Sequence, residues 1–323
     1  MRKLLFALFA LIVLSSHDMF LKLDSYFLEP NSEATIQLYN GTFDESDNTI
    51  DRDRMIDVSI VANGTRTAVD SNQWTERGNT TILDFTTGES GTYVAGVSTR
   101  ARNIEMEADA FNDYLAHDGV VDMLDKRERE GMLDRDAVEK YSKHVKTIFQ
   151  VGDKRSDDWR TPLGYPIEFM PLSNPYDLHS GDRLRVQLLL RGRPLADQLV
   201  IVDSDGGGDH GHDHDGTADH DHDHDGANQL RTDADGTLAV EIINDGTWHL
   251  RTIHMVDTEE AGLTHESNWT TLTFAVDHGQ PHSHAHGAGH AHTHDHEGGI
   301  PGYAYWVGSF LLLGGLYFWF NRK

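Results

Sequence analysis

Short runs of β-branched and aromatic residues, divided by glycine or Asn-Gly turns, dominate residues 17–100. The clearest of these runs are ATIQLYNG, MIDVSIVANG, TTILDFTTGESG and TYVAGVST. Alternating apolar residues between turn residues are typical of the strands of a β-sandwich. The pattern predicts an N-terminal β-sandwich over residues 17–152.

The pattern changes to a helical one over residues 104–146. The apolar residues that repeat at the spacing of one helical face are Ile104, Ala108, Phe111 and Leu115. Gly119 then gives a stop signal. A further segment, DRDAVEKYSKHVKTIF from Asp134, has aspartates first and lysines later, as a helix dipole favours. One or two helices packed on the first sandwich are predicted, with TIFQVG returning to the sheet.

A polar, proline-bearing stretch at residues 153–164 is interpreted as a linker to a second β region at residues 165–277. Its runs include DRLRVQLLLRGRPLADQLVIVD, GTWHLRTIHMV and NWTTLTFAV. They predict a second immunoglobulin-like or transthyretin-like sandwich, so the fold class is mainly β with a helical insertion. A polar segment at residues 209–226 interrupts this pattern and is interpreted as a loop between two strands.

Both ends of the chain carry targeting signals. Residues 1–16 join a basic start to an apolar run and two serines, which is the pattern of a secretory signal peptide cleaved after Ser15 or Ser16. Residues 301–320 form an apolar stretch with aromatic edges that ends before Arg322 and Lys323. This stretch predicts one transmembrane helix with a short cytoplasmic tail. The chain is therefore expected to be extracytoplasmic and anchored in the cytoplasmic membrane.

Composition narrows the function further. The 323 residues carry a formal net charge of −26 and include no cysteine. The acidic balance disfavours nucleic acid and anionic lipid as partners, because both prefer basic surfaces. The absence of cysteine excludes disulfides and thiolate metal sites. No GxSxG, HExxH or Gly-rich phosphate loop is found, so a non-enzymatic protein is expected.

The most unusual feature is the clustering of histidine: thirteen of the 21 histidines lie in two short tracts. The first tract spans residues 209–226 and repeats with a period of ten residues; the second lies in the linker 278–299 that precedes the apolar stretch. The tract histidines are His210, His212, His214, His220, His222 and His224, and His282, His284, His286, His290, His292, His294 and His296.

Histidines at alternate positions suit a transition metal. In an extended chain such side chains project to the same side about 6.6 Å apart, and two can close on one ion at about 2.0–2.1 Å. Imidazole suits nickel, cobalt, zinc and copper, and it binds only when neutral. The competing interpretations are a solvated acidic linker and a calcium loop. The calcium pattern beginning at Asp221 has Thr232 where glutamate is required.

If cleavage follows Ser16, His17 becomes the first residue. Its amino group and ring can chelate one ion together, and a further histidine would complete a copper brace. His254 is the candidate for this partner, with His249 on the same predicted strand but on its opposite face. The alternative for both is a strand histidine satisfied by its neighbours.

The segments HDMFLKLDSYFLEPN, YSKHVKTIFQVGD, YPIEFMPLSNPYDLHSGDRLRVQLLLRGRPLADQLV and GTWHLRTIHMV resemble the bacterial exported family described as the nickel-uptake substrate-specific region. The resemblance covers about residues 17–276. It implies a periplasmic β-domain protein that assists nickel or cobalt uptake by a transporter permease in the same membrane, with His17 and His254 as the matching histidines.

Three hypotheses follow. The first is an anchored protein that captures nickel, or else cobalt, zinc or copper, for uptake or buffering. The second is a surface binding or adhesion module with incidental metal buffering. The third is a copper-brace redox protein that uses His17.

Overall fold

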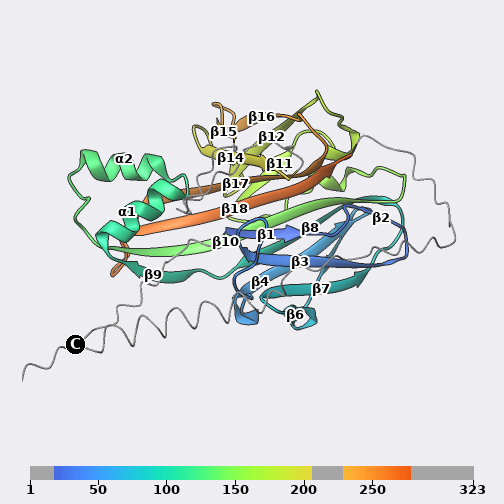
Figure 1. The fold of residues 1–323 in the computed structure, drawn as a ribbon, viewed down its shortest axis with the longest axis horizontal. Helices are drawn as coiled ribbons and strands as arrows, with labels where there is room; N and C mark the ends of the chain where they lie inside the picture. The colour runs from blue at the N-terminus through green and yellow to red at the C-terminus, as the bar shows by residue number, and fades with distance from the viewer. Residues whose placement is uncertain (1–17, 206–227, 278–323) are drawn as a thin grey trace, which may run out of the picture. The chain divides into compact units, whose positions relative to one another are not determined.

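The computed structural model describes residues 18–205 and 228–277, all within one compact unit. These residues form three β-sheets and two short α-helices (Figure 1). The mainly β fold class is confirmed, and the stacked sheets are consistent with a β-sandwich. The predicted signal peptide, both histidine tracts and the predicted membrane helix lie outside the described residues. Within the described ranges, no helix is long and apolar enough to cross a membrane.

A long sheet runs through the whole unit. Its strands, in spatial order, are β15 (Asn228–Arg231), β14 (Leu199–Ser204), β17 (Gly246–Asp257), β18 (His265–Val276), β10 (Ala137–Val151), β8 (Gly91–Thr99), β4 (Met55–Ala62) and β5 (Thr65–Ala68), and β2 (Phe27–Leu28) and β9 (Arg102–Met106) also pair with β10.

Two smaller sheets complete the layers. The N-terminal sheet has the order β1 (Asp18–Lys22), β3 (Glu33–Gly41), β7 (Thr80–Thr86) and β6 (Thr75–Arg77). The C-terminal sheet contains β11 (Ile167–Pro171), β12 (Arg183–Leu190) and β13 (Arg193–Pro194), with β16 (Thr237–Glu241) on β12.

The long sheet is joined at its centre by a parallel pair. Strand β10 runs beside β18 from Glu139 opposite His265 to Thr147 opposite Thr273. Strands from both of the regions that sequence divides at residues 153–164 therefore share one hydrogen-bonded sheet. The dividing stretch itself is docked: Asp158 is buried and accepts the backbone N–H groups of Asn63 and Gly64 at 2.7 Å each.

The two small sheets lie on opposite faces of the long sheet. On one side, the hydroxyls of Thr271 and Thr273 donate to backbone carbonyls of β1. Lys146, which is in register with Leu272 between those threonines, points the other way and bonds Glu168 of β11 at 2.7 Å. Side chains alternate between the faces of a strand. We call these sides the β1 face and the β11 face.

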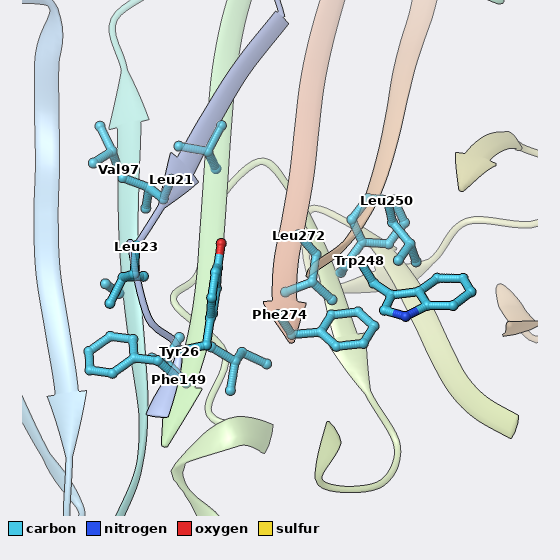
Figure 2. Packing of buried hydrophobic residues seen from close by; sticks show 14 of the residues in the cluster. Leu21, Leu23, Tyr26, Val97, Phe149, Trp248, Leu250, Leu272 and Phe274 are labelled. Carbon is cyan, nitrogen blue, oxygen red and sulfur yellow. The ribbon is translucent and has the colours of Figure 1, made fainter. Parts of the chain in front are cut away.

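Apolar side chains fill both interfaces. Figure 2 shows Trp248, Leu250, Leu272 and Phe274 gathered beside β17 and β18, and they belong to the same buried cluster as Leu21, Leu23 and Phe149 near β1. All of these side chains are at most 6% exposed. Burying side chains of this size contributes roughly 1.5–3 kcal/mol each before entropy is counted.

The helices cover one end of the β1 face. Helix α1 (Ala108–His117) buries Phe111 and Leu115, and α2 (Val121–Arg129) buries Met123. Their core also contains Ile253 and Trp269 from β17 and β18. Helix α1 ends before Gly119, which has a φ of 76°, a backbone conformation that glycine adopts without steric cost. The stop signal at Gly119 is confirmed.

Two helical predictions are wrong. Ile104 belongs to β9, not to α1, and the segment from Asp134 forms strand β10 rather than a second helix. The acidic-to-basic order seen in that segment is found instead in α2, with Asp122 first and Arg129 last. Strand β10 has hydrogen-bonded neighbours along both edges, and this tertiary pairing overrides local propensity. Its return into the sheet at TIFQVG is confirmed.

Candidate functional site

His254 is the one predicted ligand that the described residues include. The tract histidines and His17 lie outside them. Within residues 18–205 and 228–277 there is no group of three or more histidine, aspartate or glutamate side chains that could hold a metal ion.

His254 lies on the β11 face of β17. Its Nδ1 is 2.9 Å from Oε1 of Gln198, whose Nε2 donates to Ile253 O and Thr252 Oγ1. Because this amide oxygen can only accept, Nδ1 of His254 carries the proton and Nε2 keeps its lone pair. Burial, with a smaller effect of Arg191, lowers the pKa of His254, so the ring is neutral near pH 7. It can supply one nitrogen to an ion.

His249 is a core residue of the β1 face. Its ring stacks on Phe43, with the centroids 4.1 Å apart, and meets the edge of Phe20 at 5.3 Å. The side chain is 7% exposed. The strand assignments of His249 and His254 and their opposite orientations are confirmed.

His144 is a buried histidine that the sequence analysis did not single out. Its Nδ1 is 2.8 Å from Ser98 Oγ and its Nε2 is 3.0 Å from Ser142 Oγ, while Ser142 donates onward to Asn268 Oδ1. Burial lowers the pKa of His144 to about 4. The ring is neutral at pH 7, and both nitrogens are engaged in hydrogen bonds.

A cavity of about 660 Å³ opens above this network on the β11 face. Its lining includes His144, Asn268, Tyr165, Arg191 and Glu266. Arg191 and Glu266 face each other at 3.6 Å on its rim. The volume lies within the range of small-molecule sites, and the lining offers both donors and acceptors.

A charged cluster lies on the β1 face where β1 begins. Nη1 of Arg251 is 3.3 Å from Oδ2 of Asp18 and donates to the backbone carbonyl of Asp118 at 3.3 Å. Nδ1 of His117, in the last turn of α1, is 2.9 Å from Oδ1 of Asp118. This hydrogen bond raises the pKa of His117. Three distant segments therefore meet next to the first described residue.

Further ionisable groups are buried near this cluster. Burial lowers the pKa of Lys143 to about 8, and the charge of Asp18 opposes this effect. Burial also raises the pKa of Glu139, whose carboxylate accepts hydrogen bonds from Ser267 and Tyr114.

The two strands that flank the first tract meet it at the same end of the long sheet. Strand β14 ends at Ser204 and β15 begins at Asn228, which pairs with Val202. The predicted placement of the tract between two strands is confirmed. Thr232, the residue at the calcium-loop glutamate position, is buried and donates to Leu195 O at 2.7 Å, which argues against a calcium loop.

The second tract follows a strand that ends at the same place. Ser204 is in register with Trp248, and Trp248 with Phe274 near the end of β18. The backbone N–H of Asp205 bonds Thr247 O, and Thr247 pairs with Ala275. With strands about 4.8 Å apart, the two exit points lie about 10 Å apart across the sheet.

Sequence reasoning missed the residues of the His144 network and of the Asp118 cluster. Ser142, His144 and Asn268 lie on two strands that only the parallel pairing brings together. The one local signal for the second cluster is the His117-Asp118 pair directly before the Gly119 stop.

Comparison with known proteins identifies the family. Residues 14–256 match the model described as "Domain of unknown function (DUF4198)". The chain belongs to this family. The description of the family assigns it no function, so the nickel-uptake expectation remains a prediction. A search of curated proteins finds no match.

Solved structures similar to this chain include α-2-macroglobulin from Escherichia coli, with 9% identity and a TM-score of 0.23 over 80% of this chain and 15% of that one. The D0-D1 domain of intimin has 8% identity and a TM-score of 0.20, covering 80% of this chain and 97% of that one. A putative membrane-anchored protein from Corynebacterium diphtheriae has 9% identity and a TM-score of 0.21, with coverages of 80% and 58%. The chain thus spans about 15% of the length of the macroglobulin. These low similarities carry no functional argument.

Proposed function

We propose that this member of the family is an extracytoplasmic protein, anchored by its C-terminal apolar stretch, that captures divalent transition ions and concentrates them near a transporter. Nickel is the leading ion, followed by cobalt, zinc and copper. The resemblance to nickel-uptake proteins supports this choice. The protein binds its cargo and carries out no reaction.

The observation that carries the proposal is the common origin of the two tracts. Both tracts follow strands at the same end of the long sheet, where Ser204 of β14 and Phe274 of β18 are both in register with Trp248 of β17. Thirteen histidines are therefore attached to one end of a rigid body. Ions released from one tract meet imidazoles of the other at high local concentration, which favours rebinding without any new contact.

Calorimetric titration of the full-length processed chain with Ni²⁺ at pH 7.5 tests this proposal. Several ions should bind per chain. Replacing the thirteen tract histidines with serine should leave at most one. At pH 5.5 capacity should fall steeply, because histidines with a reference pKa of about 6.5 are then protonated and cannot coordinate.

The matched control replaces the aspartates of the two tracts with serine and keeps every histidine. This variant removes negative charge but not imidazole, so most of the Ni²⁺ capacity should remain. Equal stoichiometry with and without the tract histidines would refute the proposal, as would the absence of binding to the unaltered chain.

A binding module is the second candidate, favoured by the cavity above Asn268. Its ligand would be a small polar molecule or the end of a polymer. Binding that survives a chelator and is lost in Asn268→Leu would support this candidate. Retention of binding in that variant would exclude the cavity as the site.

A further inference from the structure

Asn268, on the floor of the β11-face cavity, has a side-chain donor without an acceptor. The residue is 8% exposed and lines the cavity. Its Oδ1 accepts the hydroxyl of Ser142 at 3.2 Å. Nδ2 carries two hydrogens but donates to no atom of the residues that the structure describes. Because buried polar groups are normally satisfied, Nδ2 needs an acceptor inside the cavity, which is either water or a ligand.

The hydrogen bonds of the cavity floor run in one direction. Since Oδ1 of Asn268 can only accept, the hydroxyl hydrogen of Ser142 points to it. Oγ of Ser142 therefore accepts from Nε2 of His144, while Nδ1 of His144 accepts from Ser98. Ser142 also lines the cavity. The floor thus offers a ligand the Nδ2 donor of Asn268 and a remaining lone pair of Ser142 as an acceptor.

The charged groups that line the cavity cancel each other. On the rim, Nη2 of Arg191 is 3.6 Å from Oε1 of Glu266. On the floor, burial lowers the pKa of His144 to about 4, so that the ring is neutral at pH 7. An ionised ligand would leave water without an unpaired counter-charge to receive it, which is costly. The cavity therefore favours an uncharged ligand.

Neighbouring hydroxyl groups match the donors and acceptors of the lining. Asn268 and Glu266 are two residues apart on β18, so their side chains leave the same face about 6.6 Å apart. One of these groups donates and the other accepts, and a hydroxyl can do both. Ile56 of β4 adds an apolar wall with 54% of its surface exposed. A sugar ring has hydroxyls along its edge and C–H groups on its faces, which suits both features.

An extended peptide suits this cavity less well. Such peptides often bind by adding a strand to an open sheet edge, where the backbone supplies the hydrogen bonds. The floor residues lie on β10 and β18, and both strands already have neighbours along both edges. The cavity therefore presents side chains but no backbone ladder.

We propose that the cavity on the β11 face binds a neutral saccharide, with one hydroxyl accepting from Nδ2 of Asn268, another donating to Glu266, and a ring face packed on Ile56. The inference rests on the second candidate function, a binding module, and gives it a ligand class; it does not depend on metal capture. The cavity volume of about 660 Å³ accommodates a disaccharide, since pockets of roughly 300–1,000 Å³ enclose ligands of that size.

The test is calorimetric titration of the full-length chain with maltose, cellobiose, lactose and diacetylchitobiose. The buffer contains EDTA, so that metal bound by the tracts does not contribute, and a detergent without a sugar head group, which would compete. At least one disaccharide should bind with one molecule per chain. The absence of binding tighter than about 10 mM for all four would overturn the proposal, as would binding that EDTA abolishes.

Two variants of the polar groups locate the site. At about pH 8, Asn268→Asp keeps an acceptor for Ser142 but removes the Nδ2 donor, so saccharide affinity should fall at least tenfold. Asn103→Asp is the matched control, because Asn103 is exposed on β9 outside the cavity, and it should bind as the parent chain does. Glu266→Gln replaces the charged acceptor on the rim with a neutral one and should lower affinity severalfold.

The apolar wall has a matched pair of its own. Ile56→Ser removes the surface on which the ring packs and should lower affinity severalfold. Ile243 is 62% exposed and does not line the cavity, so Ile243→Ser should leave binding unchanged. Equal effects of the two substitutions would exclude Ile56 from the site.

The outcomes separate this inference from the other proposals. Unchanged saccharide affinity in both Asn268→Asp and Glu266→Gln overturns it. If the dipeptide analogue N-acetyl-alanine amide binds in an Asn268-dependent way and the disaccharides do not, the saccharide class is excluded while the binding module stands. Should Asn268→Asp fail to fold, as circular dichroism would show, Glu266→Gln and Ile56→Ser decide. Ni²⁺ stoichiometry in Asn268→Asp should equal that of the parent chain, so failure of metal capture would appear only in the Ni²⁺ titration.

Discussion

Buried polar side chains on the two faces of the long sheet differ in their hydrogen bonding. On the β11 face, Lys146 has Glu168 as its partner and both nitrogens of His144 are hydrogen-bonded. On the β1 face, the carboxylate of Asp118 keeps an oxygen without a described partner. A fully satisfied buried group stabilises one conformation but has no remaining capacity for a ligand. The comparison therefore assigns structural roles to Lys146, Glu168 and His144, and it separates them from Asp118, whose carboxylate is engaged through one oxygen by His117.

The largest loss of stability is expected when the buried ion pair of Lys146 and Glu168 is broken. Glu168 receives Lys146 and the backbone N–H groups of Leu163 and Gly164. Glu168→Gln should lower the unfolding free energy by about 3–5 kcal/mol, because the buried ammonium loses its counter-charge. Equilibrium unfolding in guanidinium chloride measures this.

A double variant and an exposed pair serve as controls for that experiment. Lys146→Met combined with Glu168→Gln should recover much of the loss. Glu260→Gln, which breaks the exposed 2.8 Å pair with Lys140, should cost less than about 1 kcal/mol. If Glu168→Gln and Glu260→Gln lowered the unfolding free energy by similar amounts, the buried pair would be no more important for stability than the exposed pair.

Acid should weaken the β11 face through His144. Its pKa is about 4 in the fold and 6.5 ordinarily, so the unfolded chain binds more protons between these values. Stability therefore falls as pH drops from 6.5 to 4, by on the order of 3 kcal/mol from this group. Unfolding curves at several pH values should become less pH-dependent in His144→Gln.

His265 should preserve part of the pH dependence of stability when His144 is replaced. Its pKa is also lowered to about 4, chiefly by burial, so part of the acid sensitivity should survive in His144→Gln. A profile unaffected by the loss of His144 would show that its ring is not held neutral.

A smaller loss of unfolding free energy is expected when Arg251, which contacts both Asp18 and Asp118 on the β1 face, is replaced. Arg251→Gln removes the contacts with Asp18 and with the Asp118 carbonyl and should cost about 1–3 kcal/mol. Arg191→Gln, on the cavity rim, should change stability by no more than about 0.5 kcal/mol.

The smallest change in stability is expected at Asp118 itself. Asp118→Asn keeps an oxygen for His117 and replaces Oδ2, which accepts no hydrogen bond from the described residues, with an amide nitrogen. The unfolding free energy should change by less than about 1 kcal/mol. A loss above about 2 kcal/mol without metal would place Asp118 with the structural groups of the other face.

Local pattern was sufficient for the strands, for α1 and its stop at Gly119, and for the two strands flanking the first tract. It failed at β10, where lysines and aspartates in helical order were overridden by neighbours that lie far away in sequence, such as Thr273 opposite Thr147. Strand partners separated by more than a hundred residues leave no local trace.

The same reason hid the Asp118 cluster. Asp18, Asp118 and Arg251 are remote in sequence and meet only because β1 and α1 both pack on the β1 face of β17 and β18. Histidine-rich tracts, in contrast, are visible because their chemistry is a matter of composition. The metal-binding prediction for the tracts and His17 remains a prediction, since those residues lie outside the described ranges.

The parallel pairing of β10 with β18 has a consequence for synthesis. Strand β10 is complete at Val151, but the neighbour along its other edge begins only at His265. During translation, more than a hundred residues must follow before that edge is closed, and closing so long a loop is entropically slow. A nascent chain cut off ahead of β18 presents an open strand edge, so we expect truncated products to aggregate and to depend on holding chaperones.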